Sequence, residues 1–220
     1  MPSIICIETS SVVCSIALIK DGRWVGSIDN HDHNVHAQYL TTHIAQLLEQ
    51  QQLSIKQLNA IAISSGPGSY TGLRIATSVA KGLCYAANIP LIAIPTLSAL
   101  AHAAQQQFRN ATYYIPMIDA RRMEVYTAIF DTHLQIILAP QAIILPHLLI
   151  NPYLDKPEAV FCGNGANKIL SVSDFQATYI NTATLNFSAN HLTNLALLAY
   201  QNKEFVDIAY FEPFYLKNNY

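Results

Sequence analysis

A glycine-rich loop between an apolar run and a helix-length segment is the feature that most constrains the fold of this chain. Residues 60–63 are apolar, and the sequence Gly-Pro-Gly-Ser-Tyr-Thr-Gly follows at 66–72. Residues 72–87 contain no proline and few β-branched side chains, so they predict a helix. A strand, a glycine turn and a helix in this order indicate an α/β protein. The helix N-terminus would attract an anion, but the loop lacks the G-x-G-x-x-G spacing and Lys81 lies too far along for a P-loop.

The composition limits the classes of function. The chain has 220 residues, a formal net charge of −2 and only 12% charged side chains, about half the usual fraction. A surface with so few charges predicts that a partner covers apolar area. The absence of a Lys/Arg run argues against autonomous binding to nucleic acid. No signal-peptide pattern and no long apolar run occur, so we expect a cytoplasmic protein without membrane contact.

The cysteines and a histidine cluster do not predict a metal centre. The four cysteines are scattered without a C-x-x-C pair, which is typical of buried, reduced thiols. His31, His33 and His36 lie within six residues, but only His33 and His36 have helical spacing, and no acidic or cysteine ligand follows in register. We expect a polar loop entering a helix, with a metal site as the alternative. The motifs G-x-S-x-G and H-E-x-x-H are also absent, so no catalytic residue is predicted.

Two predicted helices offer a surface for a partner. The helix over 36–51 has an apolar core stripe and a second face that carries Tyr39 and His43. The helix after the glycine loop is apolar around more than half of its circumference and carries a seam of small residues that would let another helix approach closely. Either the first helix of the same chain or a partner subunit covers this seam, and the sequence leaves both open. The predicted interface residues are Tyr39, His43, Leu73, Ala76, Thr77, Ala80 and Cys84.

The two halves of the chain repeat one pattern. Each half contains an apolar strand, an acidic residue, a short polar turn and a second strand, and Glu8 of the first half corresponds to Asp119 of the second. This similarity predicts an internal duplication. We therefore expect two lobes, 1–107 and 108–220, with a C-terminal helix over about 188–203 that can pack back on the first lobe.

Duplicated lobes with glycine turns resemble the actin-like ATPase superfamily, which has a two-lobed, ribonuclease H-like α/β fold with a mixed sheet and helices in each lobe. In that superfamily the first turn of each lobe binds phosphates, and an acid at the end of the strand binds Mg²⁺ or a water molecule. In this chain the turn after Glu8 lacks glycine, and the second turn carries Arg121 and Arg122. The sequence therefore favours a chain that has kept this fold but has lost the nucleotide-binding site. The candidate nucleotide-binding residues are Glu8, Thr9, Ser10, Gly163 and Gly165.

Motifs along nearly the whole chain resemble the TsaB (YeaZ) family. The most specific are G-P-G-S-Y-T-G-L-R-I at 66–75 and I-D-A-R-R-M-E-V-Y at 118–126. Shorter matches are I-E-T-S at 7–10, H-A-Q at 36–38, A-N-I-P at 87–90 and E-P-F-Y-L at 212–216.

The resemblance implies a function. TsaB proteins are non-catalytic partners of TsaD, which transfers a threonylcarbamoyl group to the adenosine next to the anticodon of tRNAs that read codons starting with A, and the ATPase TsaE joins the complex. It also implies a homodimer when the chain is alone, tRNA contact only through the complex, and no tightly bound cofactor, with ATP or ADP held at most at the partner interface. The metal-binding H-x-x-x-H pair of TsaD corresponds to Thr96 and Leu100, which argues against a metal-dependent glycoprotease. An actin-like ATPase or kinase is the alternative function.

Overall fold

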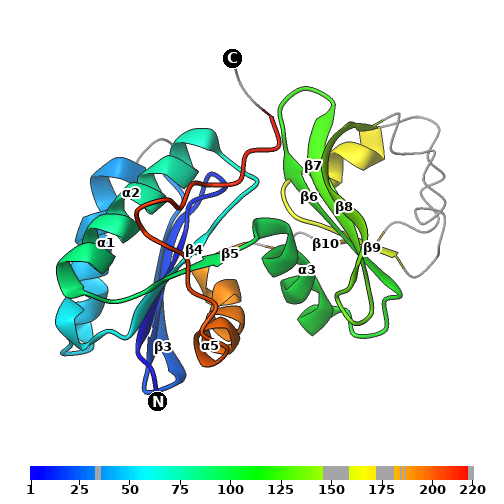
Figure 1. Ribbon diagram of the computed structural model, residues 1–220. Helices are drawn as coiled ribbons and strands as arrows, with labels where there is room; N and C mark the ends of the chain where they lie inside the picture. Colours follow the sequence, from blue (N-terminus) through cyan, green and yellow to red (C-terminus); the bar gives the residue numbers. More distant parts are fainter. Residues whose placement is uncertain (33–35, 146–158, 172–180, 184, 186, 218–220) are drawn as a thin grey trace. The chain divides into compact units, whose positions relative to one another are not determined.

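The chain divides into two compact units, each built on its own sheet (Figure 1). The computed structural model describes all residues except 33–35, 146–158, 172–180, 184, 186 and 218–220. Unit 1 comprises Met1–Thr96 and Ser188–Phe214, and unit 2 comprises Leu97–Phe187 and Tyr215–Tyr220. The sequence-based boundary at 107/108 differs from this division, which assigns nearly all of helix α3 (Thr96–Gln107) to unit 2.

Unit 1 contains a mixed five-stranded sheet in the order β3-β2-β1-β4-β5. The pairs β1–β2 and β2–β3 are antiparallel, whereas β4 is parallel to both β1 and β5. All residues of β1 and β4 are buried, because the sheet is covered on both faces. The strands are β1 (Ile4–Glu8), β2 (Cys14–Lys20), β3 (Arg23–Asn30), β4 (Ala60–Ser64) and β5 (Leu91–Ile94).

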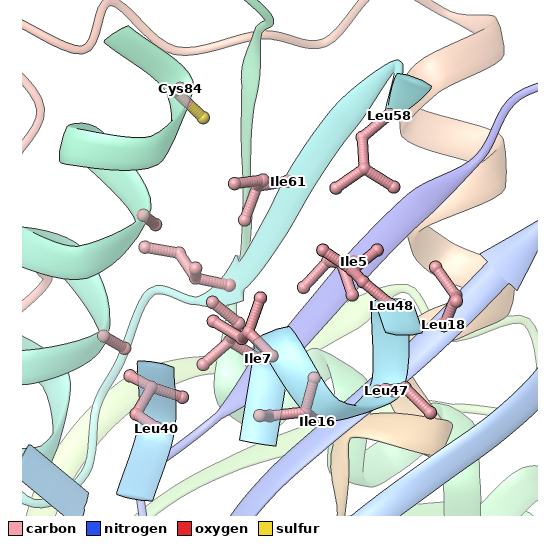
Figure 2. Packing of buried hydrophobic residues seen from close by; sticks show 14 of the residues in the cluster. Ile5, Ile7, Ile16, Leu18, Leu40, Leu47, Leu48, Leu58, Ile61 and Cys84 are labelled. Carbon is pink, nitrogen blue, oxygen red and sulfur yellow. The ribbon is translucent and has the colours of Figure 1, made fainter. Parts of the chain in front are cut away.

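Two long helices cover one face of this sheet. They are α1 (His36–Gln50) and α2 (Tyr70–Ala87), joined to the strands through η1 (Ile55–Gln57) and the glycine loop. Figure 2 shows their core, in which Leu40 and Leu47 of α1 meet Ile5 and Ile7 of β1. Alternate strand residues line this core, as expected for a period of two. The α2 helix begins two residues earlier than the sequence predicts, and Ser69 caps it.

The C-terminal part of unit 1 completes this sheet and its core. The helices η4 (Ala189–Leu192) and α5 (Thr193–Gln201) contact β1 and β2, and α5 also contacts β5. Val206 then forms an antiparallel bridge with Leu91 at the edge of the sheet. Further on, the Phe214 backbone N–H donates to the Ser65 carbonyl (2.7 Å), which ties the chain to the glycine loop.

Unit 2 repeats the topology of unit 1. Its sheet has the order β10-β9-β6-β7-β8, with β6–β7–β8 antiparallel and β9 parallel to both β6 and β10. This match confirms the repeated strand–acid–turn–strand pattern read from the sequence and the mixed-sheet α/β class. The elements are β6 (Tyr113–Asp119), β7 (Glu124–Asp131), β8 (Ile136–Ile144), β9 (Ala159–Cys162), η2 (Ala166–Ser171) and β10 (Asn181–Ala183).

None of the helices in the described ranges combines the length and the hydropathy that a bilayer crossing requires.

Candidate functional site

The acid at the end of β1 lies in a closed network of hydrogen bonds. The carboxyl of Glu8 is fully buried. Its Oε1 accepts from the Ser10 backbone N–H (2.5 Å) and the Ser10 hydroxyl, and its Oε2 accepts from the Ser64 hydroxyl. Burial raises the pKa of Glu8 above its ordinary value of 4.5, although the hydrogen bonds from Ser10 and Ser64 oppose that rise. This carboxyl therefore links β1, its turn and β4.

The glycine loop packs directly on the turn after Glu8. The Thr9 hydroxyl donates to the Gly72 carbonyl (2.8 Å), and the Ser69 backbone N–H donates to the Ser10 carbonyl (2.7 Å). A β-carbon on Gly68 would lie 2.6 Å from the Ser10 β-carbon, and one on Gly72 would collide with the Thr9 carbonyl oxygen. The glycines are thus needed because another backbone segment occupies the space in front of them.

This packing changes the interpretation of three predicted nucleotide-binding residues. Glu8, Thr9 and Ser10 are all buried and already hydrogen-bonded within the chain. The loop fills the volume in front of the turn, so a phosphate would have to displace it. The sequence could not reveal this arrangement, because Glu8 and Ser64 are brought together only by the parallel pairing of β1 with β4.

The second glycine turn serves a similar packing role in unit 2. Gly163 has a positive φ of 97°, and a β-carbon on it would lie 2.5 Å from the Met117 carbonyl oxygen. The Gly165 backbone N–H donates to that same oxygen (2.9 Å). Between them, the Asn164 Oδ1 accepts from the Asp119 backbone N–H (3.0 Å). Both predicted glycines therefore hold the turn against β6.

The acid at the end of β6 lies in a different environment from Glu8. The side chain of Asp119 is 43% exposed and forms an ion pair with Lys168 (2.5 Å). The same ammonium donates to the carbonyls of Arg122 (2.6 Å) and Glu124 (3.1 Å). The Glu124 carboxylate pairs in turn with Lys217. Each acid of the β6–β7 turn is thus paired with a lysine, and Lys168 also fixes the backbone of the turn.

The two arginines of this turn are exposed and have an uncommon backbone conformation. Arg121 and Arg122 have φ values of 68° and 46°, a left-handed region that glycine and asparagine favour. The Arg121 backbone N–H donates to Asp119 Oδ1 (2.7 Å). Within the described part of the chain, neither guanidinium has an ion pair.

The positions that correspond to a metal-binding histidine pair have structural roles here. Thr96 is buried, and its hydroxyl accepts a hydrogen bond from the Gly66 backbone N–H (3.1 Å). Leu100 is buried as well. Among the described residues there is no group of three potential metal ligands. His33 lies outside the described residues, so the alternative of a metal site at His33 and His36 is not tested.

The four cysteines do not form a reactive site. All are free and buried. Burial raises the pKa of Cys14 and Cys84 to about 11, and it raises the pKa of Cys6 and Cys162 further. Thiols with such values are protonated near neutral pH and are poor nucleophiles.

Part of the predicted partner interface is corrected by the structure. Leu73, Ala76, Ala80 and Cys84 are at most 1% exposed, and the last three belong to the core between α2, α1 and the sheet. Figure 2 shows Cys84 directed into this core. The small-residue seam is therefore covered by the chain itself, which is the alternative that the sequence left open. Its side chains are not available to a partner.

The other three predicted interface residues are half-buried or buried and carry polar atoms. Tyr39 and His43 are half-buried on α1, and their rings stack at 5.5 Å between centroids. Thr77 on α2 is 7% exposed. Neither His43 Nδ1 nor Thr77 Oγ1 has a hydrogen-bond partner among the described residues.

A further surface on α2 escaped the sequence analysis. Ser78, Gly82 and Ala86 are exposed and four residues apart, so they share one face of the helix. A β-carbon on Gly82 would meet nothing within 4 Å. Tyr85 beside them is 82% exposed. The signal in the sequence was a glycine inside a helix, where it costs stability without an evident internal reason.

Comparison with known proteins identifies a family model and several proteins that are similar to this chain. The family model described as TsaD, tRNA N6-adenosine threonylcarbamoyltransferase, matches residues 30–219. A tRNA threonylcarbamoyladenosine biosynthesis protein TsaB from Haemophilus influenzae is 29% identical over 227 residues, which cover 98% of this chain and 94% of the relative. The TsaB of Escherichia coli is 35% identical over 128 residues, covering 57% of this chain and 53% of that protein.

Two solved structures are also similar to this chain in fold and in sequence. YeaZ from Pseudomonas aeruginosa superposes with a TM-score of 0.83 at 27% sequence identity, covering 98% of this chain and all of that chain. A second crystal structure, described as an uncharacterized protein with similarity to peptidase YeaZ from the same organism, gives 0.85 at 27% identity, with 99% of this chain covered and all of that one.

Proposed function

Because this chain belongs to the TsaB (YeaZ) family and matches the TsaD family model over residues 30–219, we propose that it is the non-catalytic subunit of a tRNA threonylcarbamoyladenosine biosynthesis complex. Its partners are a TsaD-type subunit, which transfers the threonylcarbamoyl group to the adenosine next to the anticodon, and the ATPase TsaE. The complex is cytoplasmic, and this chain contacts tRNA only as part of the complex. Alone, the chain forms a homodimer.

The environments of the two acids support a non-catalytic role. Glu8 is enclosed by hydroxyl and backbone donors, and Asp119 is neutralised by Lys168. A carboxylate that binds Mg²⁺ or a water molecule needs an accessible, unpaired oxygen. The resemblance to TsaD aligns the metal-binding histidine pair of that protein with Thr96 and Leu100. We propose that no cofactor is resident, and that ATP or ADP binds only where partner chains meet.

The exposed face of α2 is the observation that carries the proposed interface. A glycine inside a helix costs roughly 1 kcal/mol relative to alanine. The internal packing of this chain does not require Gly82, since a β-carbon there meets nothing within 4 Å. Close approach by an external helix would require it, and Ser78 and Ala86 continue the small-residue face on either side. We propose that a partner helix packs here.

Two polar atoms of α1 and α2 lack a hydrogen bond among the described residues. Thr77 Oγ1 and His43 Nδ1 are buried and have no hydrogen bond within the described chain, an arrangement that costs about 1–3 kcal/mol per group. The exposed face of α2 binds TsaD in the complex and a second copy of this chain in the homodimer.

The test compares two leucine substitutions on exposed helix positions. Gly82→Leu should reduce co-purification with TsaD by at least tenfold, because the larger side chain prevents close helix approach. The matched control Gln106→Leu places leucine on α3 and should leave assembly unchanged. Both variants should unfold near the wild-type temperature. Undiminished assembly of Gly82→Leu with TsaD would contradict the interface.

Calorimetry with Mg-ATP separates the subunit from the alternative enzyme. The isolated wild-type chain should give no strong binding signal. Tight binding that disappears in Glu8→Gln would instead support an actin-like ATPase or kinase.

A further inference from the structure

The turn between β6 and β7 carries a local excess of positive charge in an otherwise slightly acidic chain. Its two acids, Asp119 and Glu124, each have a lysine partner, Lys168 and Lys217. Arg121 and Arg122 are exposed and without an ion pair among the described residues. The pairing of the acids leaves the two guanidinium charges uncompensated, whereas the whole chain has a net charge of −2.

The backbone of this turn is held in a conformation that arginine does not favour. Two consecutive left-handed residues in a hairpin are usually asparagine and glycine, yet both positions are arginine, with φ values of 68° and 46°. Lys168 stabilises this conformation by donating to Asp119 and to two carbonyls of the turn. Strained residues that the surrounding structure holds in place point to a use for their side chains.

We infer that the Arg121–Arg122 turn binds the phosphodiester backbone of the tRNA in the assembled complex. The inference rests on the proposed function, which supplies an RNA substrate. Guanidinium groups bind phosphate oxygens through paired N–H donors. Met123 is the single large apolar side chain of the turn that is exposed, at 41%, which is too little for the apolar centre of a protein interface. An RNA is therefore favoured over an acidic protein surface.

Two phosphate contacts are few, which agrees with the expectation that the chain does not bind RNA on its own. Each contact adds about 0.7 to 0.9 to the slope of log affinity against log salt. The turn would thus add affinity and orientation to a complex whose other subunits supply most of the binding. Because its contribution is electrostatic, it should decline as salt increases.

The test measures tRNA binding to the reconstituted complex with TsaD and TsaE, by filter binding over a series of KCl concentrations. The double variant Arg121→Gln/Arg122→Gln should lower the affinity about tenfold at low salt and reduce the salt slope by about one to two. Arg121→Lys/Arg122→Lys should restore the slope, because it keeps both charges. The control Arg23→Gln/Lys203→Gln removes two exposed cations of unit 1 and should leave binding unchanged.

Two results would overturn the inference. One is unchanged tRNA affinity and salt slope in the double glutamine variant. The other is loss of co-purification with TsaD, which would show that the turn contacts protein. If the wild-type complex fails to assemble or to modify tRNA, the proposed function itself fails. If it works and the variants bind tRNA normally, only this inference fails.

Discussion

The β1–β2 and β6–β7 hairpins have the same topology and opposite chemistry. In the first, Glu8 is fully buried and bonded to serines, and the glycine loop covers the turn. In the second, Asp119 is half-exposed, paired with Lys168, and followed by two exposed arginines. One acid is part of the core, whereas the other helps to fix a cationic surface turn.

The difference shows how a duplicated unit can take on separate tasks. In unit 1 the glycine loop packs tightly against the turn that follows the acid, whereas in unit 2 the glycine turn packs against the strand that carries it. In unit 1 this packing encloses the acid and positions α2, the proposed partner helix. In unit 2 it leaves the turn accessible. The shared topology therefore does not imply a shared phosphate site, and each turn has to be tested by itself.

The largest expected contrast is in the stability cost of removing each acid. Glu8→Ala leaves three buried donors without an acceptor, so it should lower the free energy of unfolding by about 2–4 kcal/mol. Asp119→Ala breaks a partly exposed ion pair and should cost less than about 1 kcal/mol. Urea unfolding followed by circular dichroism measures both. Equal costs for the two variants would remove the contrast between the hairpins.

A smaller effect is expected from filling the space at the glycine turns. Gly72→Ala forces a β-carbon against the Thr9 carbonyl and should cost about 2 kcal/mol. Gly165→Ala, whose β-carbon would lie 2.9 Å from the Ile118 carbonyl carbon, should cost about 1 kcal/mol. Gly82→Ala is the matched control and should stabilise the isolated chain by about 0.5–1 kcal/mol. Thermal unfolding that ranks the three differently would contradict the packing described here.

The smallest effect concerns pH. The pKa of Glu8 is raised in the folded chain, so between its ordinary value of 4.5 and the raised one the folded state binds more protons than the unfolded state. The stability that Glu8 contributes is therefore fully present below pH 4.5 and is lost as pH rises through the raised pKa. The slope is at most about 1.4 kcal/mol per pH unit.

The variant Glu8→Gln isolates this contribution. The difference in unfolding free energy between wild type and Glu8→Gln should change with pH in favour of the variant as pH rises. A difference that stays constant across the pH range would rule out a raised pKa for Glu8.

The sequence was sufficient for the features that depend on local pattern. The apolar strands, the glycine turn before α2 and the correspondence of Glu8 with Asp119 all follow from periodicity and spacing, and the sheet orders confirm the repeat. Ala76 and Ala80 were predicted to contact a partner, but both are buried in the core of the chain itself. Helical periodicity shows how wide an apolar face is, but not which neighbour covers it.

Contacts between residues that are far apart in the chain could not be predicted from the sequence. The hydrogen bond from Ser64 to Glu8 and the ion pair of Lys168 with Asp119 join residues far apart in the chain. Both depend on the parallel pairing of strands, which brings the carboxyl ends of β1 and β4, or of β6 and β9, to one edge. The turn conformation of Arg121 and Arg122 likewise required coordinates, because neither residue type favours it.

The most direct test of the account is depletion of this protein in its host, followed by mass spectrometry of nucleosides from total tRNA. The account predicts that threonylcarbamoyladenosine disappears as the protein is depleted. A wild-type copy should restore the modification, whereas Gly82→Leu should not. Threonylcarbamoyladenosine retained at its normal level after complete depletion would contradict the assignment.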